Sequence, residues 1–250
     1  MWNNNRLKEL GLLPQWRLRP DSGNHLTKPD QQIKLKNDAE KTEPVSLIAS
    51  MDWTQLNQAV GECMACPLAQ TRKNTVFGVG DQAASWLFIG EGPGAREDEM
   101  GEPFVGQAGK LLDSLLQAIH LDRHHDVYIA NIVKCRPPSN RNPQTIEAAT
   151  CRPYLLRQIA LIEPKLIITL GKVAAENLLN THDSLVSLRG RVHDFLGIPL
   201  IVTYHPAYLL RSLTDKAKAW EDLCFARATM YKIRQNLELN LPVPRSDEMQ

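Results

Sequence analysis

The chain has 250 residues, of which 43% are hydrophobic and 23% are charged, and these values are typical of a globular protein. The composition therefore excludes a wholly disordered chain, a collagen and a disulfide-rich miniprotein. The formal net charge is only +1, so any basic surface for nucleic acid has to be local.

The sequence shows no signal for a membrane or for secretion. It contains no run of about 18 apolar residues, which a transmembrane helix would need. Its start, MWNNNRLKEL, lacks the apolar stretch of a signal peptide. We therefore expect a cytoplasmic protein. Its five cysteines would then be metal ligands or free thiols rather than disulfides.

The chain divides into four segments. Residues 1–20 form a short leucine-rich segment that we interpret as a partner-binding peptide. Residues 21–50 are polar, contain Pro29 and Pro44, and show no helical or strand period, which predicts a disordered linker. A globular domain is expected over 51–238, followed by a flexible tail over 239–250.

Within the domain, short apolar runs alternate with segments of helical period. Helices are expected at 52–61, 107–119, 144–162, 172–179 and 215–237, and strands at 85–90, 127–133, 165–170 and 199–203. This alternation predicts an α/β fold with a central parallel sheet flanked by helices. In such folds the functional site lies at the carboxyl ends of the strands.

Two loops follow the first expected strand. Residues 90–94 (GEGPG) let the backbone approach a ligand closely, and Glu91 and Glu97 supply carboxylates nearby. A plain turn followed by a solvated acidic face is the alternative. Phe104 lies in a second glycine-rich loop that leads into a helix. It is a candidate ligand contact, although an aromatic residue there can equally belong to the core.

The ends of two other strands carry polar candidates. Asn131 offers an amide that can pair with the complementary edge of a base, and a cap or turn asparagine is the alternative. His205 precedes Pro206 at the end of the last strand, so it is held extended and directed out of the sheet. Its position makes it a catalytic candidate, although most isolated histidines are structural.

The cysteines form a pattern of their own. Cys63 and Cys66 make a C-x-x-C pair, and Cys135 and Cys151 follow in arginine- and proline-rich segments. Four such thiolates could hold a [4Fe–4S] cluster or a zinc ion, while independent buried thiols are the alternative. Cys224 lies between two apolar residues of the last expected helix, where core packing is the simpler interpretation.

Together these segments resemble the family four (iron–sulfur) uracil-DNA glycosylases. The resemblance covers residues 52–234 and rests on GEGPG at 90–94, EPFVGQAG at 102–109, NIVKCRPP at 131–138, HPAYLLR at 205–211 and the four-cysteine spacing. It implies the three-layer uracil-DNA glycosylase fold. It also implies hydrolysis of the N-glycosidic bond of deoxyuridine in DNA, which releases uracil and leaves an abasic site.

The resemblance also implies roles for the candidates. Phe104 would stack on the extruded uracil, Asn131 would bind its amide edge, and His205 would stabilise the negative charge on its oxygen. Backbone N–H groups of Gly90 and Gly92 would assist. Better-known glycosylases have a water-activating aspartate at the position of Gly92. That leaves two nearby carboxylates as candidates for this role, namely Glu91 and Glu97.

By the same resemblance, Cys63, Cys66, Cys135 and Cys151 would ligate a [4Fe–4S] cluster. The cluster would present arginines to the DNA phosphates, and a leucine of the 209–211 loop would wedge into the duplex. The expected DNA contacts are Arg136, Arg141, Leu209, Leu210 and Arg211.

Two alternatives to a glycosylase stay open. A catalytically silent uracil-DNA-binding module is one, because the amino-terminal segment of some phage DNA polymerases shares these motifs. The other is a relative that traps the abasic sugar covalently through a histidine in a basic loop. Residues 189–193 (RGRVH) are a short segment of this kind, with a histidine beside two arginines.

Residues 6–20 (RLKELGLLPQWRLRP) resemble a different protein, the extreme amino terminus of the psi subunit of the bacterial DNA polymerase III clamp loader. That segment binds the chi subunit, so the resemblance implies chi as a partner. An incidental leucine-rich tail is the alternative. The residues that would contact chi are Leu7, Leu10, Leu12, Trp16 and Leu18.

Overall fold

The computed structural model describes the backbone of residues 43–239 and the side chains of residues 47–237. The expected partner-binding peptide, residues 21–42 of the expected linker and most of the expected tail therefore lie outside the described residues. Within the described part, no helix is long and apolar enough to cross a membrane.

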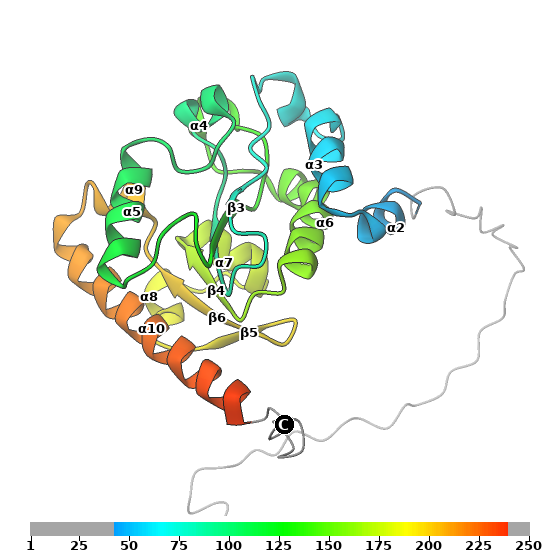
Figure 1. The fold of residues 1–250 in the computed structure, drawn as a ribbon. Coiled ribbons are helices and arrows are strands. Elements are labelled where there is room, and N and C mark those ends of the chain that lie inside the picture. Colours follow the sequence, from blue (N-terminus) through cyan, green and yellow to red (C-terminus); the bar gives the residue numbers. More distant parts are fainter. Residues whose placement is uncertain (1–42, 240–250) are drawn as a thin grey trace, which may run out of the picture. The chain divides into compact units, whose positions relative to one another are not determined.

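A six-stranded sheet forms the centre of the described domain, with the strand order β1-β3-β2-β4-β6-β5 (Figure 1). The four inner strands pair in parallel, and the short strands at the two edges are antiparallel. The parallel sheet expected from the sequence is confirmed. The strands are β1 Val79–Gly80, β2 Trp86–Gly90, β3 Val127–Asn131, β4 Leu166–Leu170, β5 His193–Phe195 and β6 Ile198–Thr203.

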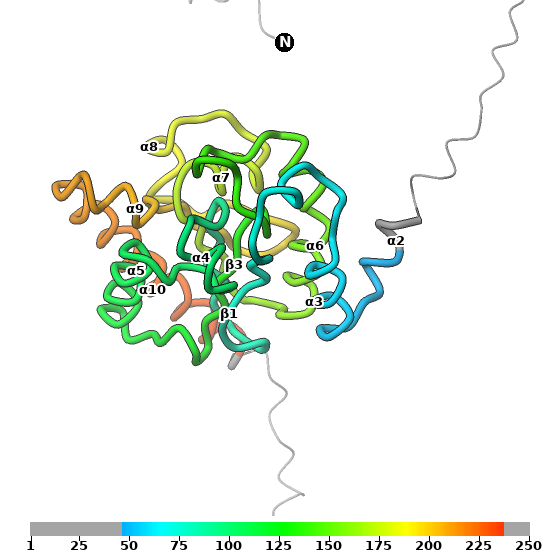
Figure 2. The backbone as a smooth tube through the Cα atoms, turned by 90° about the horizontal axis from the view of Figure 1, so that it is seen from above, coloured from blue at the N-terminus to red at the C-terminus, as the bar shows by residue number. Residues whose placement is uncertain are grey.

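Helices cover both faces of this sheet. Alternate residues of each inner strand face opposite ways, as in β2, where Leu87 packs toward one helical layer and Phe88 toward the other. In both views α5 (Gln107–Ala118) and α10 (Lys216–Leu239) lie on one side, and α3 (Trp53–Glu62) and α6 (Thr145–Ile162) lie opposite (Figures 1 and 2). The three layers expected from the resemblance are therefore present.

The domain begins earlier in the chain than the sequence suggested. Residues Glu43–Ser50 form α2, although 21–50 was expected to be a disordered linker. Ile48 is buried with Leu56 and Phe77, so this helix belongs to the domain. Pro44 is compatible with the helix because backbone N–H groups in the first turn make no intrahelical hydrogen bond, so a proline there loses none.

The remaining elements are short, apart from α7. They are η1 Pro67–Gln70, α4 Ala95–Met100, η2 Pro138–Asn140, α7 Lys172–Leu179, α8 Leu185–Leu188, α9 Pro206–Leu209 and η3 Leu213–Asp215. Helix α3 begins where the sequence predicts, because the Asp52 side chain accepts a hydrogen bond from Gln55 N at 2.8 Å and the Gln55 side chain accepts one from Asp52 N at 3.0 Å.

The topology brings the carboxyl ends of the inner strands to one edge of the sheet. Gly90 ends β2 directly beside Asn131, which ends β3. Gly171 follows β4, and His205 follows β6 after one intervening residue. Four loops that are distant in sequence thus meet at this edge, as parallel α/β sheets require.

Candidate active site

A cavity of about 470 Å³ opens at this edge of the sheet. Other cavities of the described domain have similar volumes, so size does not single it out. What distinguishes it is the convergence of residues that the sequence predicted separately. Those that line it are Glu91, Gly92, Glu97, Phe104, Asn131, Arg141, His205 and Arg211.

Asn131 is the buried amide of this cavity. Its side chain is 2% exposed, and its Oδ1 atom has no hydrogen-bond partner in the described structure. A Cβ on Gly90 would lie 2.5 Å from that oxygen, so the glycine makes room for the amide. Buried amide oxygens are normally paired. The unpaired Oδ1 therefore indicates a place for a ligand N–H.

His205 has a defined tautomer. Its Nδ1 atom accepts a hydrogen bond from Ala207 N at 3.1 Å, so the proton of the neutral ring is on Nε2. Burial, and then the charge of Arg211, lower its pKa to about 4, although Glu97 acts in the opposite direction. The imidazole is consequently neutral at pH 7 and presents one N–H donor.

Gly171 leaves room for His205, and sequence reasoning missed it. Its φ is +94°, a conformation that favours glycine, and a Cβ there would lie 2.8 Å from the His205 Cβ. The signal was available in the sequence, because a glycine directly follows the apolar run KLIITL.

Phe104 reaches the cavity from the loop before α5. Its ring centroid lies 5.6 Å from that of His205, with 31° between the planes. The residue is 6% exposed and also contacts the apolar core between the sheet and α5. The two interpretations of Phe104 are therefore compatible, since the ring closes the core and lines the cavity.

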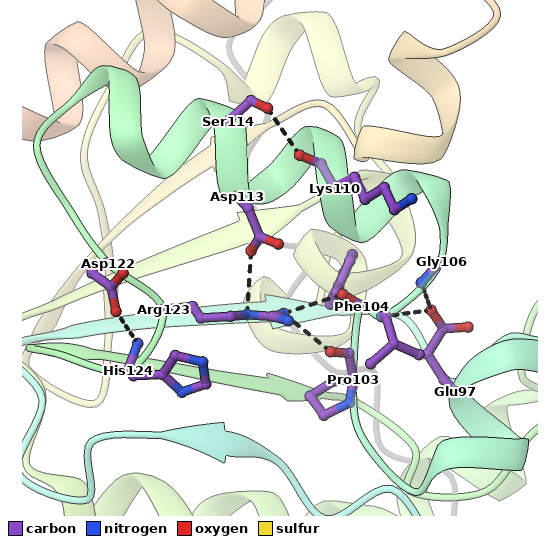
Figure 3. Close-up of polar contacts among 11 residues, drawn as sticks. Glu97, Pro103, Phe104, Gly106, Lys110, Asp113, Ser114, Asp122, Arg123 and His124 are labelled. Carbon is purple, nitrogen blue, oxygen red and sulfur yellow. Dashed lines mark hydrogen bonds and ion pairs between the residues drawn. The ribbon is translucent and has the colours of Figure 1, made fainter.

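The two carboxylates differ in their surroundings. Oε1 of Glu97 accepts hydrogen bonds from Val105 N at 3.0 Å and Gly106 N at 3.1 Å (Figure 3). Glu97 thereby holds the loop that carries Phe104. Glu91 is half-buried in the cavity wall, and burial raises its pKa.

The structure brings the four predicted cysteine ligands together around a second, small cavity. Cys63 follows α3, Cys66 precedes η1, Cys135 follows β3 and Cys151 lies in α6, and all four line this cavity. Cys224 is not among the lining residues. This arrangement joins three segments of the chain that are distant in sequence.

Hydrogen-bond donors face two of these sulfurs. Arg72 Nη1 donates to Cys135 Sγ at 3.0 Å, and Lys134 N donates to Cys151 Sγ at 3.4 Å. The Lys134 side chain is 1% exposed, and its Nζ donates to Asn131 O at 2.9 Å. Burial lowers the pKa of Lys134 to about 8, whereas the Cys151 and Cys135 sulfurs raise it.

The donors beside these sulfurs fit an anionic thiolate centre, whereas burial opposes ionisation of the free thiols. Burial raises the pKa of Cys135, and raises that of Cys151 to about 11. The two sulfurs become thiolates at neutral pH when metal displaces their protons. Among the described residues, no group of three or more candidate ligands is placed around a single ion. In a [4Fe–4S] cluster each thiolate binds a different iron.

The expected DNA-contacting residues are exposed to different degrees. Leu209 is completely buried with Tyr204, whereas Leu210 is 41% exposed, so only Leu210 offers apolar surface to a duplex. Arg141 is not free, because it makes hydrogen bonds of 2.9 and 2.7 Å to the two carboxylate oxygens of Glu147. Arg136 Nε donates to Asn140 Oδ1 at 2.7 Å.

Comparisons with known proteins agree with this geometry. Residues 77–224 match the uracil DNA glycosylase superfamily. A Type-4 uracil-DNA glycosylase of Thermotoga maritima is 43% identical over 165 residues, which span 65% of this chain and 85% of the relative. One of Pyrobaculum aerophilum is 39% identical over 69% of this chain and 92% of the relative. A DNA polymerase of Bacillus phage SP01 is 29% identical, over 54% of this chain and 14% of the polymerase.

Proposed function

The chain belongs to the uracil DNA glycosylase superfamily, and we propose that it is a DNA repair enzyme that hydrolyses the N-glycosidic bond of deoxyuridine. The products are free uracil and an abasic site, with no strand cleavage. The observation that carries this proposal is the unpaired, buried Oδ1 of Asn131 in a cavity that also holds a neutral His205.

Recognition begins with extrusion of the nucleotide, because the target atom is not accessible inside a duplex. The base enters the cavity and stacks on Phe104. Asn131 Oδ1 accepts the N3–H of uracil, and its amide nitrogen donates to O4. Cytosine presents an acceptor at N3 and an amino group at C4, so both contacts fail. The same amide therefore binds uracil and rejects cytosine.

His205 acts on the leaving group. As the glycosidic bond breaks, negative charge develops on the uracil O2 oxygen. The Nε2–H of the neutral imidazole donates to that oxygen, aided by backbone N–H groups near Gly90 and Gly92. A preorganised donor directed at developing charge typically lowers the activation free energy by about 3 kcal/mol. Because the ring is held by Ala207 N, it does not have to reorient during the reaction.

We assign the water-orienting role to Glu91. Water attacks the sugar as the base departs, and a carboxylate at the cavity wall can orient that water and stabilise the cationic sugar. Glu97 is committed through Oε1 to two backbone N–H groups, so its contribution is to hold the Phe104 loop and to add negative charge near the sugar.

The four thiols fit a [4Fe–4S] cluster ligated by Cys63, Cys66, Cys135 and Cys151. Hydrolysis of a glycosidic bond transfers no electrons, so the chemistry that the cluster supplies is structural cross-linking. Lys134 connects the cysteine site to the active site, because it is adjacent to Cys135 in the chain and its side chain donates to the Asn131 carbonyl. DNA contact falls to Arg136, Leu210 and Arg211, while Arg141 is held by Glu147.

A denaturing gel distinguishes this proposal from its two alternatives. Incubation with a uracil-containing oligonucleotide should yield an alkali-labile abasic product and uncrosslinked protein. Intact DNA after incubation would favour a silent binding module, and a stable adduct would favour covalent trapping. The structure gives trapping little support, because the His193 ring contacts Leu188 O at 2.7 Å and no residue of 189–193 lines the described cavity.

The protonation state of His205 can be measured directly. In protein labelled with ¹⁵N-histidine, the His205 ring should show the neutral Nε2–H pattern at pH 6, because its pKa lies near 4. Below pH 6.5 the unfolded chain binds a proton at this residue that the folded chain does not, so folding stability should fall as the pH drops from 6.5 toward 4. A His205 resonance that titrates near pH 6.5, assigned with His205→Asn, would contradict this state.

For the amino terminus we propose docking on the chi subunit, which would place uracil excision at the replication machinery. The proposal rests on the motif in residues 6–20. An aromatic anchor such as Trp16 typically dominates a short interface. A peptide of residues 1–22 should bind purified chi, psi should compete with it, and Trp16→Ala should abolish binding. If the full chain shows no binding to chi at concentrations of about tens of micromolar, docking is refuted and the glycosylase proposal stays intact.

A further inference from the structure

Phe104 has an unusual backbone conformation for a bulky residue. Its φ is +54°, in the left-handed region that favours glycine. A residue other than glycine remains in this conformation only where its surroundings hold it, and such residues cluster at ligand sites. The loop around Phe104 should therefore contain groups that fix it, and these groups would set the position of the ring in the cavity.

One such group is Arg123, which comes from the loop between α5 and β3. Its Nη2 atom donates to the carbonyl oxygens of Pro103 at 3.2 Å and Phe104 at 3.1 Å. Its Nε atom lies 3.2 Å from Asp113 Oδ1 on α5, and the arginine side chain is only 16% exposed. Figure 3 shows the guanidinium between Asp113 and the two carbonyls.

The opposite side of the loop is held as well. Glu97 accepts the N–H groups of Val105 and Gly106, while a Cβ on Gly109 would overlap the Phe104 carbonyl group. Carbonyl oxygens on one side and N–H groups on the other are thus bound by side chains of opposite charge. Arg123 itself does not line the cavity, so it has no direct contact with a base there.

We propose that the Arg123–Asp113 pair is a positioning element of the active site, which holds Phe104 in the orientation that receives the extruded uracil. Asp113 attracts the guanidinium as an ion pair beside Nε, without a hydrogen bond between these two atoms, and Nη2 donates to the two carbonyls. This geometry uses the planar fork of arginine, and lysine would supply only a point charge. The inference rests on the proposed function, because it concerns the residue that stacks on uracil.

A double-mutant cycle tests this coupling. Stacking of a base on an aromatic ring contributes about 1–3 kcal/mol, or about 5- to 150-fold. Arg123→Met should lose part of it and slow single-turnover excision about tenfold. In the Phe104→Ala background the same change should slow excision by less than about twofold, because groups that act through one another are not additive.

Two further measurements separate positioning from folding. Arg234→Met removes another arginine–aspartate pair, Arg234 with Asp126 at 2.6 Å, and should excise uracil at the parental rate. Affinity for duplex with an abasic site should be unchanged by Arg123→Met, since such DNA has no base to stack on Phe104. If Arg123→Met fails to fold, Asp113→Asn keeps the test available, with a smaller loss that also disappears in the Phe104→Ala background.

The outcomes separate the inference from the function it rests on. Parental excision by both Arg123→Met and Asp113→Asn, or losses that multiply with that of Phe104→Ala, would overturn the positioning role alone. A parental chain that releases no uracil would refute the proposed function and this inference with it.

Discussion

His205→Ala and Asn131→Ala should each slow single-turnover excision of uracil by about a hundredfold or more, the usual size of the loss when one preorganised hydrogen-bonding group of an active site is removed. The two variants remove different interactions. His205→Ala removes the Nε2–H donor to the leaving oxygen. Asn131→Ala removes the amide that the structure leaves unpaired and buried, so it should also weaken discrimination between uracil and cytosine.

The measurement is the rate of uracil release with enzyme in excess over oligonucleotide, so that product dissociation does not contribute. Cys224→Ser is the matched control, because Cys224 lines neither cavity in the described structure. Excision by His205→Ala at the parental rate would show that charge on the uracil oxygen is stabilised elsewhere.

Cys135→Ser and Cys151→Ser should each lose brown colour, bound iron and thermal stability together. A [4Fe–4S] cluster needs four thiolates, and metal binding at sites that form only on folding contributes directly to folding stability. Without the cluster, the buried Lys134 ammonium would lose the anionic sulfurs beside it. Its contact with the Asn131 carbonyl would be disturbed, so excision should fall as well.

Iron analysis of anaerobically purified protein should give about four irons per parental chain. Cys224→Ser should match the parental chain in colour, iron and melting temperature. Stoichiometric zinc without iron, in protein expressed with ample iron, would contradict the cluster assignment.

Sequence reasoning predicted the sheet because each inner strand is a short apolar run, and such runs are typical of strands buried on both faces. It failed at α2, where a polar composition and Pro44 suggested a linker. That helix is fixed by a tertiary contact, the burial of Ile48 against Leu56 and Phe77. Local sequence carries no record of such a contact.

The cavity residues Asn131 and His205 could be predicted because they lie at or just after the ends of strands, and parallel topology gathers strand ends at one edge. Arg123 could not. It lies in the loop at the opposite ends of the strands, and only the length of its side chain brings it to the Phe104 carbonyls. Positions 209 and 210 are both leucine, so the sequence does not distinguish them. Only the packing shows that Leu210 is the exposed one.

The most direct measurement of the central claim is the identity of the base released from matched duplexes that carry uracil or cytosine opposite guanine. The full-length chain, with its iron content measured, should release free uracil from the first duplex and leave its sugar–phosphate backbone intact until alkali is added. No base should appear from the second duplex, since cytosine mismatches the Asn131 amide. Absence of free uracil from iron-loaded protein, or release of cytosine at a comparable rate, would contradict the account.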